Sequence, residues 1–216
     1  YSSRRQRQMC IRDSLEMRAW LAAEIDGFDY AKVRNPGYVP ARRLTREEYN
    51  RTIRDLVGLD LRPADEFPMD FSGTSGFSNS ANTLFLQTAH LDRYFTSAEG
   101  VIDEVRADEK AWKKLVVNPQ DAGAAITGMM RRAYRRPPTH AETKEIISRY
   151  ETELEEKKPQ DEALANAFKA ILVSPNFLLR VENSVATAKD QEVSDFDLAT
   201  RLSYFLWAST PDDKLL

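Results

Sequence analysis

Apolar positions recur at helical spacing along most of the chain, with capping residues ahead of several stretches. The apolar residues that follow Thr45 form one stripe, at positions i, i+4, i+7 and i+8: Tyr49, Ile53, Leu56 and Val57. Such a stripe is typical of a helix with one buried face. Thr45 and Glu48 have the spacing of a capping box, and Gly58 suits the end of the helix. The pattern predicts a helix between Thr45 and Gly58.

Similar signals predict helices along the rest of the chain, and no convincing alternating strand pattern accompanies them. The helices are expected over residues 15–28, 86–105, 122–135 and 139–158, from Ser174-Pro175 onward, over residues 194–209, and from Thr210-Pro211 onward. Asn118-Pro119 indicates a turn, and residues 105–121 leave room for a short helical connection. The predicted fold class is all-α, with helical bundle units joined by one long loop containing Gly, Ser and Asn.

That loop covers residues 60–85 and is longer than a typical connection, which is common for functional loops. We expect its four phenylalanines to anchor it on a core: Phe67, Phe71, Phe77 and Phe85. A wider core prediction comprises Tyr49, Ile53, Leu56, Phe168, Ile171, Phe177, Leu178, Phe205 and Trp207.

The loop also gathers oxygen donors, and its candidate ligand-binding residues are Asp70, Ser72, Asn79 and Asn82. Carboxylate and amide oxygens are the ligands that calcium prefers. The EF-hand spacing fails, however, because Ser75 stands where glycine is needed and Ala81 where glutamate is needed. The competing interpretation is that these side chains satisfy backbone groups in consecutive turns.

Residues 1–14 change the apparent composition. The stretch "YSSRRQRQMCIRDS" resembles a translated sequencing adapter and is interpreted as a non-native segment. Without it, Lys+Arg falls from 31 to 27, Asp+Glu from 34 to 33, and the net charge moves from −3 to −6. The single cysteine, Cys10, is lost as well, so no disulfide, thiolate or cysteine metal site is expected. No run reaches the ~20 apolar residues of a membrane span.

The mild acidity argues against a general nucleic-acid surface. Basic clusters occur at 41–43 and 130–138, where arginines could contact phosphates. We instead expect them to pair with internal carboxylates and fix how helices dock. His90 is interpreted as a surface or half-buried helix residue, and His140 as an exposed helix start. No serine elbow or metal motif accompanies them, and no catalytic constellation is recognised.

Four ordered segments carry a family resemblance: "RRLTREEYNRTIRDLVGLDLRPADEFPMDFSGTSGFSN", "RRAYRRPPTHAE", "AILVSPNFLLRVE" and "LATRLSYFLWASTPDD". Together they resemble planctomycete-type multidomain proteins, in which a cytochrome c-like domain precedes a series of domains of unknown function. The division that follows is an adapter-like segment at 1–14, the end of a cytochrome c-like domain and linker at 15–40, helical units at 41–118 and 119–190, and the start of a third unit at 191–216, expected to continue past Leu216.

The resemblance implies that flanking domains carry haem c and that these residues themselves bind none. It also implies a periplasmic or otherwise extracytoplasmic location. The sequence-based hypothesis is a non-catalytic helical scaffold within an exported, haem-associated protein. Its expected partners are the flanking domains of the same chain and a polysaccharide or redox partner, with no nucleic acid and no membrane span. The alternative is part of a polysaccharide-acting enzyme whose site is completed by downstream residues.

Overall fold

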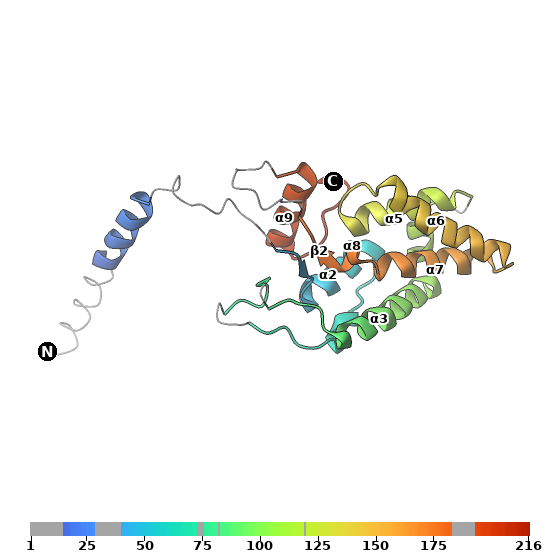
Figure 1. Ribbon diagram of the computed structural model, residues 1–216, viewed down its shortest axis with the longest axis horizontal. Helices are drawn as coiled ribbons and strands as arrows, with labels where there is room; N and C mark the ends of the chain where they lie inside the picture. Colours follow the sequence, from blue (N-terminus) through green and yellow to red (C-terminus); the bar gives the residue numbers. More distant parts are fainter. Residues whose placement is uncertain (1–14, 29–39, 73–75, 82, 119, 183–192) are drawn as a thin grey trace. The chain divides into compact units, whose positions relative to one another are not determined.

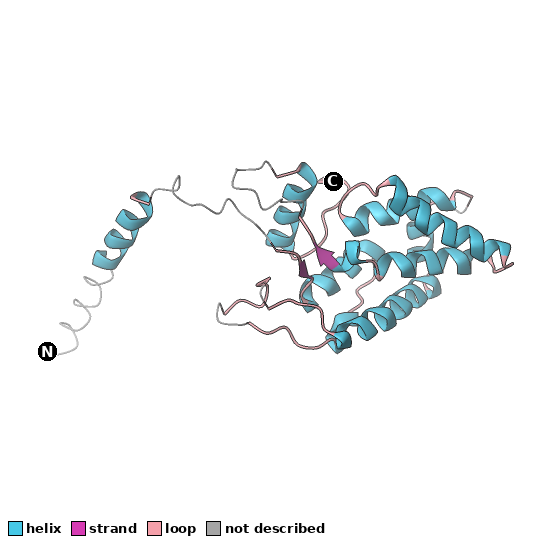
Figure 2. Ribbon diagram, in the orientation of Figure 1, coloured by secondary structure: helices cyan, strands magenta, loops and turns pink. Residues whose placement is uncertain are grey.

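The computed structural model of the chain describes residues 15–28, 40–72, 76–81, 83–118, 120–182 and 193–216. The regular elements of the described part are helices apart from two strands of two residues each (Figure 2), which confirms the all-α prediction. The chain divides into two compact units. One contains residues 1–38 and 185–191, and the other residues 39–184 and 192–216. Each unit is described by itself.

The described part of the smaller unit is a helix over residues 15–26. It ends at Gly27, whose backbone N–H donates to the carbonyl of Ala23 at 2.9 Å. Its large apolar side chains, such as Trp20 and Ile25, are exposed. The helix predicted over residues 15–28 is therefore confirmed apart from its last turn.

The larger unit contains the remaining elements, labelled as in Figure 1. In chain order they are β1 (Arg42–Arg43), α2 (Arg46–Val57), the 3₁₀ helix η2 (Pro63–Glu66), α3 (Thr88–Ala107), α4 (Glu109–Val116), α5 (Ala122–Tyr134), α6 (His140–Glu155), α7 (Gln160–Leu172), α8 (Pro175–Leu178), β2 (Leu179–Arg180) and α9 (Asp195–Trp207).

Side-chain caps set the starts of α2 and α6, as the sequence predicted. Thr45 begins α2 with a capping box, in which its hydroxyl accepts from the Glu48 N–H and the Glu48 carboxylate accepts from the Thr45 N–H. Thr139 and Glu142 form the same arrangement at α6. Each box satisfies two backbone donors that the first turn of a helix leaves open.

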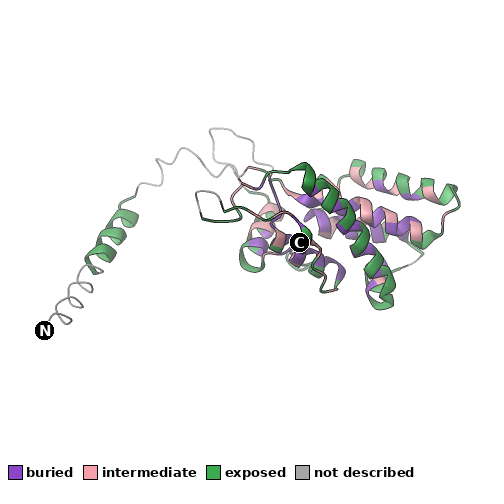
Figure 3. Ribbon diagram, turned by 90° about the horizontal axis from the view of Figure 1, so that it is seen from below, coloured by how far each residue is buried: buried purple, intermediate pink, exposed green. Residues whose placement is uncertain are grey.

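The centre of the larger unit is α7, which packs against α3, α5 and α6 (Figure 1). Figure 3 shows buried residues along the faces where these helices meet. Ala163, Ala165 and Ala167 are buried on α7, and their small side chains allow neighbouring backbones to come close. Phe168 is fully buried and lies edge-on to Trp112 of α4, with ring centroids 5.9 Å apart.

A short strand pair ties the start of the unit to its later part. Arg42 is aligned with Arg180 and Arg43 with Leu179 in an antiparallel register. The Leu44 N–H then donates to the carbonyl of Leu178 at 3.2 Å. The sequence did not predict this pairing, because strands of two residues are too short to show an alternating pattern.

Two predictions at the end of the chain are wrong. Helix α9 buries Ala199, Ser203 and Tyr204, whereas Phe205 and Trp207 are 85% and 56% exposed. No helix starts after Thr210 in the described residues, because residues 213–215 form a single turn. The other predicted core residues are buried.

Candidate functional site: an aromatic loop on a fixed base

The long loop is held at its base by one buried arginine. We call residues 67–87 the aromatic loop, of which residues 73–75 and 82 lie outside the described part. Arg43 Nη1 donates to Asp70 Oδ1 at 2.7 Å, and its Nε donates to the carbonyl of Phe85 at 3.4 Å. The Arg43 N–H also donates to the carbonyl of Leu84. Since Asp70 and Phe85 lie on opposite arms of the loop, Arg43 fixes both arms against β1.

Asp70 is a structural residue at this base. Its Oδ2 accepts from the backbone N–H of Arg46 at 2.8 Å, at the first turn of α2. The side chains of Arg43 and Asp70 are 4% and 10% exposed. Buried charges in proteins are paired and hydrogen-bonded, and both conditions hold here. The structure thus places Asp70 in a buried ion pair rather than on the loop surface.

The positions of the other candidate ligand residues differ from that of Asp70 in exposure. Ser72 and Asn79 are exposed, and Asn79 lies in a turn. Asn82 lies outside the described residues. Among the described residues, no group of three or more His, Cys, Asp or Glu side chains is placed to hold a metal ion.

The aromatic loop presents large apolar side chains to solvent. Phe67 is buried and packs on Tyr49 and Tyr94, with ring centroids 5.0 and 5.1 Å away. Phe71, Phe77 and Phe85 are 71%, 68% and 60% exposed, and Met69 is 70% exposed. The expectation that all four phenylalanines anchor the loop is therefore wrong for three of them. Figure 1 shows the described parts of this loop extending away from the helices.

His90 lies near the start of α3 and is buried, whereas the sequence predicted a surface or half-buried position. No described group hydrogen-bonds either of its ring nitrogens. Burial lowers the pKa of the imidazole, and the positive charge of Arg43 lowers it further. His90 is therefore neutral near pH 7. His140 is exposed at the start of α6, as predicted.

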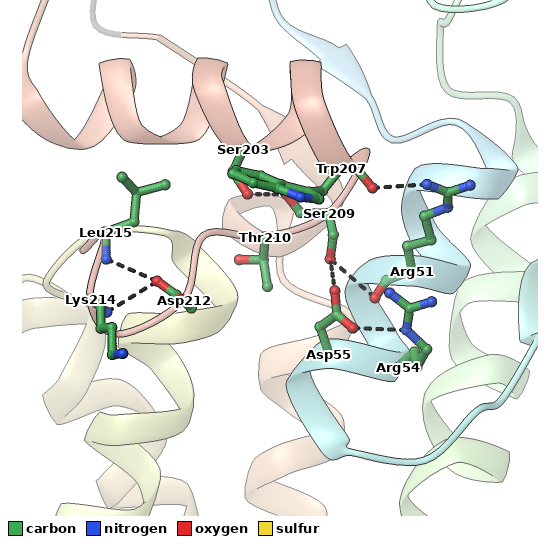
Figure 4. Close-up of a pocket in the computed structure, with 10 residues that line it drawn as sticks. All are labelled: Arg51, Arg54, Asp55, Ser203, Trp207, Ser209, Thr210, Asp212, Lys214 and Leu215. Carbon is green, nitrogen blue, oxygen red and sulfur yellow. Dashed lines mark hydrogen bonds and ion pairs between the residues drawn. The ribbon is translucent and has the colours of Figure 1, made fainter.

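A separate pocket of about 540 Å³ lies between α2 and the residues that follow α9 (Figure 4). Its walls are tied together by polar contacts: Ser209 Oγ donates to Asp55 Oδ2 at 2.5 Å, and Arg51 Nη1 donates to the carbonyl of Trp207 at 3.1 Å. Arg54 and Lys214 also line it, and the exposed indole of Trp207 forms part of its wall. Small-molecule sites are usually lined mostly by apolar and aromatic side chains, and this pocket shares with them an aromatic wall and a volume in the common range, although most of its lining residues are polar.

Asp55, the acid between these walls, is held in its charged form. Burial raises the pKa of its carboxyl, but hydrogen bonds from Arg54 and Ser209 outweigh burial and leave the pKa below its ordinary value. A general acid needs a raised pKa. Asp55 therefore acts as an ion-pair and hydrogen-bond acceptor in this structure.

Arginines of the two basic clusters are paired with carboxylates inside the larger unit. Arg42 donates from both terminal nitrogens to the carboxylate of Glu48, each at 2.7 Å. Burial raises the pKa of Glu48, but Arg42 outweighs burial, so the pKa lies below its ordinary value. Arg136 makes a similar two-point contact with Glu142, at 2.9 and 2.7 Å. The prediction that arginines of the basic clusters pair with internal carboxylates is confirmed for Arg42, Arg43 and Arg136.

The fold and these sites define a class of protein: a helical chain built from a series of domains of unknown function. Three families match in succession, each described as "Protein of unknown function". They are DUF1587 over residues 42–107, DUF1595 over 121–182 and DUF1592 over 193–216. The four motif segments of the resemblance all fall within these ranges. Comparison with curated proteins and with solved structures gave no match.

The three matched ranges pack on one another in the larger unit. Thr52 in the first range bonds to Tyr204 in the third through their hydroxyls, at 2.9 Å. Arg135 in the second range donates to the Tyr204 hydroxyl at 3.3 Å. No described helix combines the length and apolar character needed to cross a membrane.

Proposed function

We propose that this chain is a non-catalytic helical interaction module that docks a protein partner through the aromatic loop. The partner is a flanking domain of the same exported, haem-associated polypeptide. The observation that carries this proposal is the exposure of Met69, Phe71, Phe77 and Phe85 on one loop whose base is fixed. Single exposed apolar residues are ordinary, whereas several on one loop favour an interaction site.

The gain available from covering these side chains is large enough for specific binding. Burying a Phe or Met side chain contributes roughly 1.5–3 kcal/mol, so four would contribute roughly 6–12 kcal/mol before the costs of association. Those costs are smaller when a loop is already ordered. Arg43 supplies that order by bonding to Asp70 and to the carbonyl of Phe85.

The scaffold part of the proposal is supported by the packing of the three matched ranges into one unit. Polar side chains link them, as in the contact between Thr52 and Tyr204. The exported and haem-associated setting rests on the family resemblance, which implies haem c in flanking domains.

The test uses the longer native polypeptide, purified with its flanking domains. Cross-linking and mass spectrometry would identify what lies against the loop in the unmodified protein and in a Phe71→Ser/Phe77→Ser variant. We expect loop-to-domain cross-links that are lost in the variant. Phe95→Ser is a matched control, because Phe95 is 58% exposed on α3, outside the loop. Unchanged cross-links in the double variant would refute the docking function.

A second candidate function, polysaccharide binding or cleavage, is favoured by the Trp207 wall of the pocket in Figure 4. The apolar faces of sugar rings pack on indole rings, and polar groups around the ring fix its orientation. Affinity electrophoresis of the protein and of Trp207→Ala through gels containing polysaccharide would test this function. Retardation that persists in Trp207→Ala would exclude this pocket as the sugar site.

A further inference from the structure

A small polar pocket lies where α5 ends, beside β2 and α9. Its volume is about 160 Å³. Three arginines line it, Arg135, Arg136 and Arg180, together with the acids Glu182 and Asp197. It is separate from the aromatic loop and from the pocket of Figure 4, since none of these five residues lines that pocket.

Arg135 is buried without a carboxylate partner of its own. Its Nη2 donates to the carbonyls of Asn176, Phe177 and Leu179, at 2.8, 3.0 and 3.0 Å. Its Nη1 donates to the hydroxyl of Tyr204. All these acceptors are neutral, and the residue is 4% exposed. Hydrogen bonds to dipoles satisfy its N–H groups but leave its full positive charge in place.

Arg180 is the second such cation. Its guanidinium carbon lies 4.7 Å from the centroid of the Tyr204 ring. The nearest carboxylate is that of Glu48, at 3.7 Å from Nη1, and Glu48 is already held at two points by Arg42. The Nε of Arg180 is buried and has no hydrogen-bond partner among the described residues. Burial lowers the pKa of this guanidinium, and the charge of Arg42 lowers it further.

Two further charged pairs are already formed at the pocket. Arg136 is bound by Glu142, and the carboxylate of Glu182 accepts from Arg201. Asp197 Oδ2 accepts from the hydroxyl of Ser194, so Asp197 keeps its negative charge as Arg135 keeps its positive one. The two cations Arg135 and Arg180 thus share the pocket with one carboxylate that no ion pair among the described residues engages, and the net charge that remains is positive and attracts an additional negative group.

We propose that this pocket binds a small oxyanion, either a free anion or the acidic group of a small metabolite, beside Arg180 and Arg135. The volume suits a single phosphate, sulfate or carboxylate group and is too small for a drug-sized ligand. Arg is the residue best suited to recognise such groups, because its planar fork matches their oxygens. Binding there would offset the repulsion between two desolvated cations and would stabilise the contact between β2 and α9.

The experiment measures the melting temperature, Tm, of the full chain in phosphate, sulfate and acetate, each against chloride at equal ionic strength. At ten times the dissociation constant we expect a rise of about 3–6 °C in Tm. A rise in Tm with phosphate and sulfate alone would indicate a site for a tetrahedral dianion, whereas a rise with acetate would indicate a site for a carboxylate. Equal Tm values in all four salts would refute the site.

Three variants make the assignment specific. Arg180→Met removes one cation at similar length, and we expect the anion response to disappear. Thr200→Glu introduces a carboxylate at a lining position, so we expect a higher Tm without phosphate and no further rise with it. Arg149→Met is the control, since Arg149 is exposed and paired with Glu145 on α6, and its response should equal that of the unmodified chain. A full anion response in Arg180→Met or Thr200→Glu, each folded by circular dichroism, would overturn the proposal.

Discussion

Replacing Asp70 by alanine tests whether the base of the aromatic loop is an ion pair or a ligand site. In the folded chain Asp70 accepts from Arg43 Nη1 and from the N–H of Arg46. Asp70→Ala leaves the buried guanidinium of Arg43 with two backbone carbonyls, those of Leu44 and Phe85, and no carboxylate. The first turn of α2 also loses an acceptor.

Breaking one side of a buried pair costs about 3–5 kcal/mol. Because Arg43 keeps two neutral acceptors, we expect Asp70→Ala to lower the free energy of unfolding by about 3–4 kcal/mol. The measurement is urea unfolding followed by circular dichroism at 222 nm. Glu66→Ala is the control: Glu66 pairs with Arg93 on the surface, and exposed pairs contribute about 0–1 kcal/mol.

The double variant Arg43→Met/Asp70→Ala separates the pair from the general loss of a side chain. Removing both charges avoids an unpaired buried cation, so we expect the double variant to be more stable than Asp70→Ala alone. If Asp70→Ala were as stable as Glu66→Ala, or if the double variant were the least stable, the ion-pair interpretation of Asp70 would be wrong.

Three further predictions concern the core, a cap and a buried arginine. Phe177→Ala should cost about 3–5 kcal/mol of unfolding free energy because Phe177 is fully buried, whereas Phe205→Ala should cost no more than ~0.5 kcal/mol, both by urea unfolding. The bonds of Glu142 to Arg136 and to the Thr139 N–H hold its pKa at about 2, against 4.5 unfolded. A lowered acid pKa stabilises the fold above pH 4.5, and this contribution is lost between about pH 4.5 and pH 2. Unfolding at a series of pH values should therefore show a smaller acid loss for Glu142→Gln; an unchanged profile would contradict the assigned pKa. Arg135→Lys should lower Tm even though charge is kept, since a single ammonium nitrogen cannot bind the three carbonyls at Nη2 and the Tyr204 hydroxyl at Nη1 together, and an unchanged Tm would contradict that role.

Local signals explain what the sequence predicted correctly. The capping boxes at Thr45 and Thr139 act within one turn, so their spacing alone identifies the starts of α2 and α6. Helix α7 was not predicted, because Pro159 stands at its start and no side-chain cap marks it. The apolar and alanine-rich composition of α7 was the signal from which this helix could have been predicted.

Tertiary contacts explain what the sequence could not give. Apolar residues follow one another on several sides of α9, so their pattern does not show which side is buried, and that side is set by contacts of Tyr204 with Thr52 and Arg180. Asp70 was identified as a notable loop residue, but its role depends on Arg43, 27 residues away in sequence. Burial of Arg43, Arg135 and His90 likewise depends on neighbours that come from distant parts of the chain.

The strand pair and the Thr52–Tyr204 bond also constrain when the protein can finish folding during synthesis. Tyr204 follows Thr52 by 152 residues. At about 5–20 residues per second, roughly 8–30 s pass between the appearance of α2 on the ribosome and that of its last partner. During that interval Thr52 lacks its hydrogen-bond partner, so α2 cannot complete its native contacts until α9 has been made.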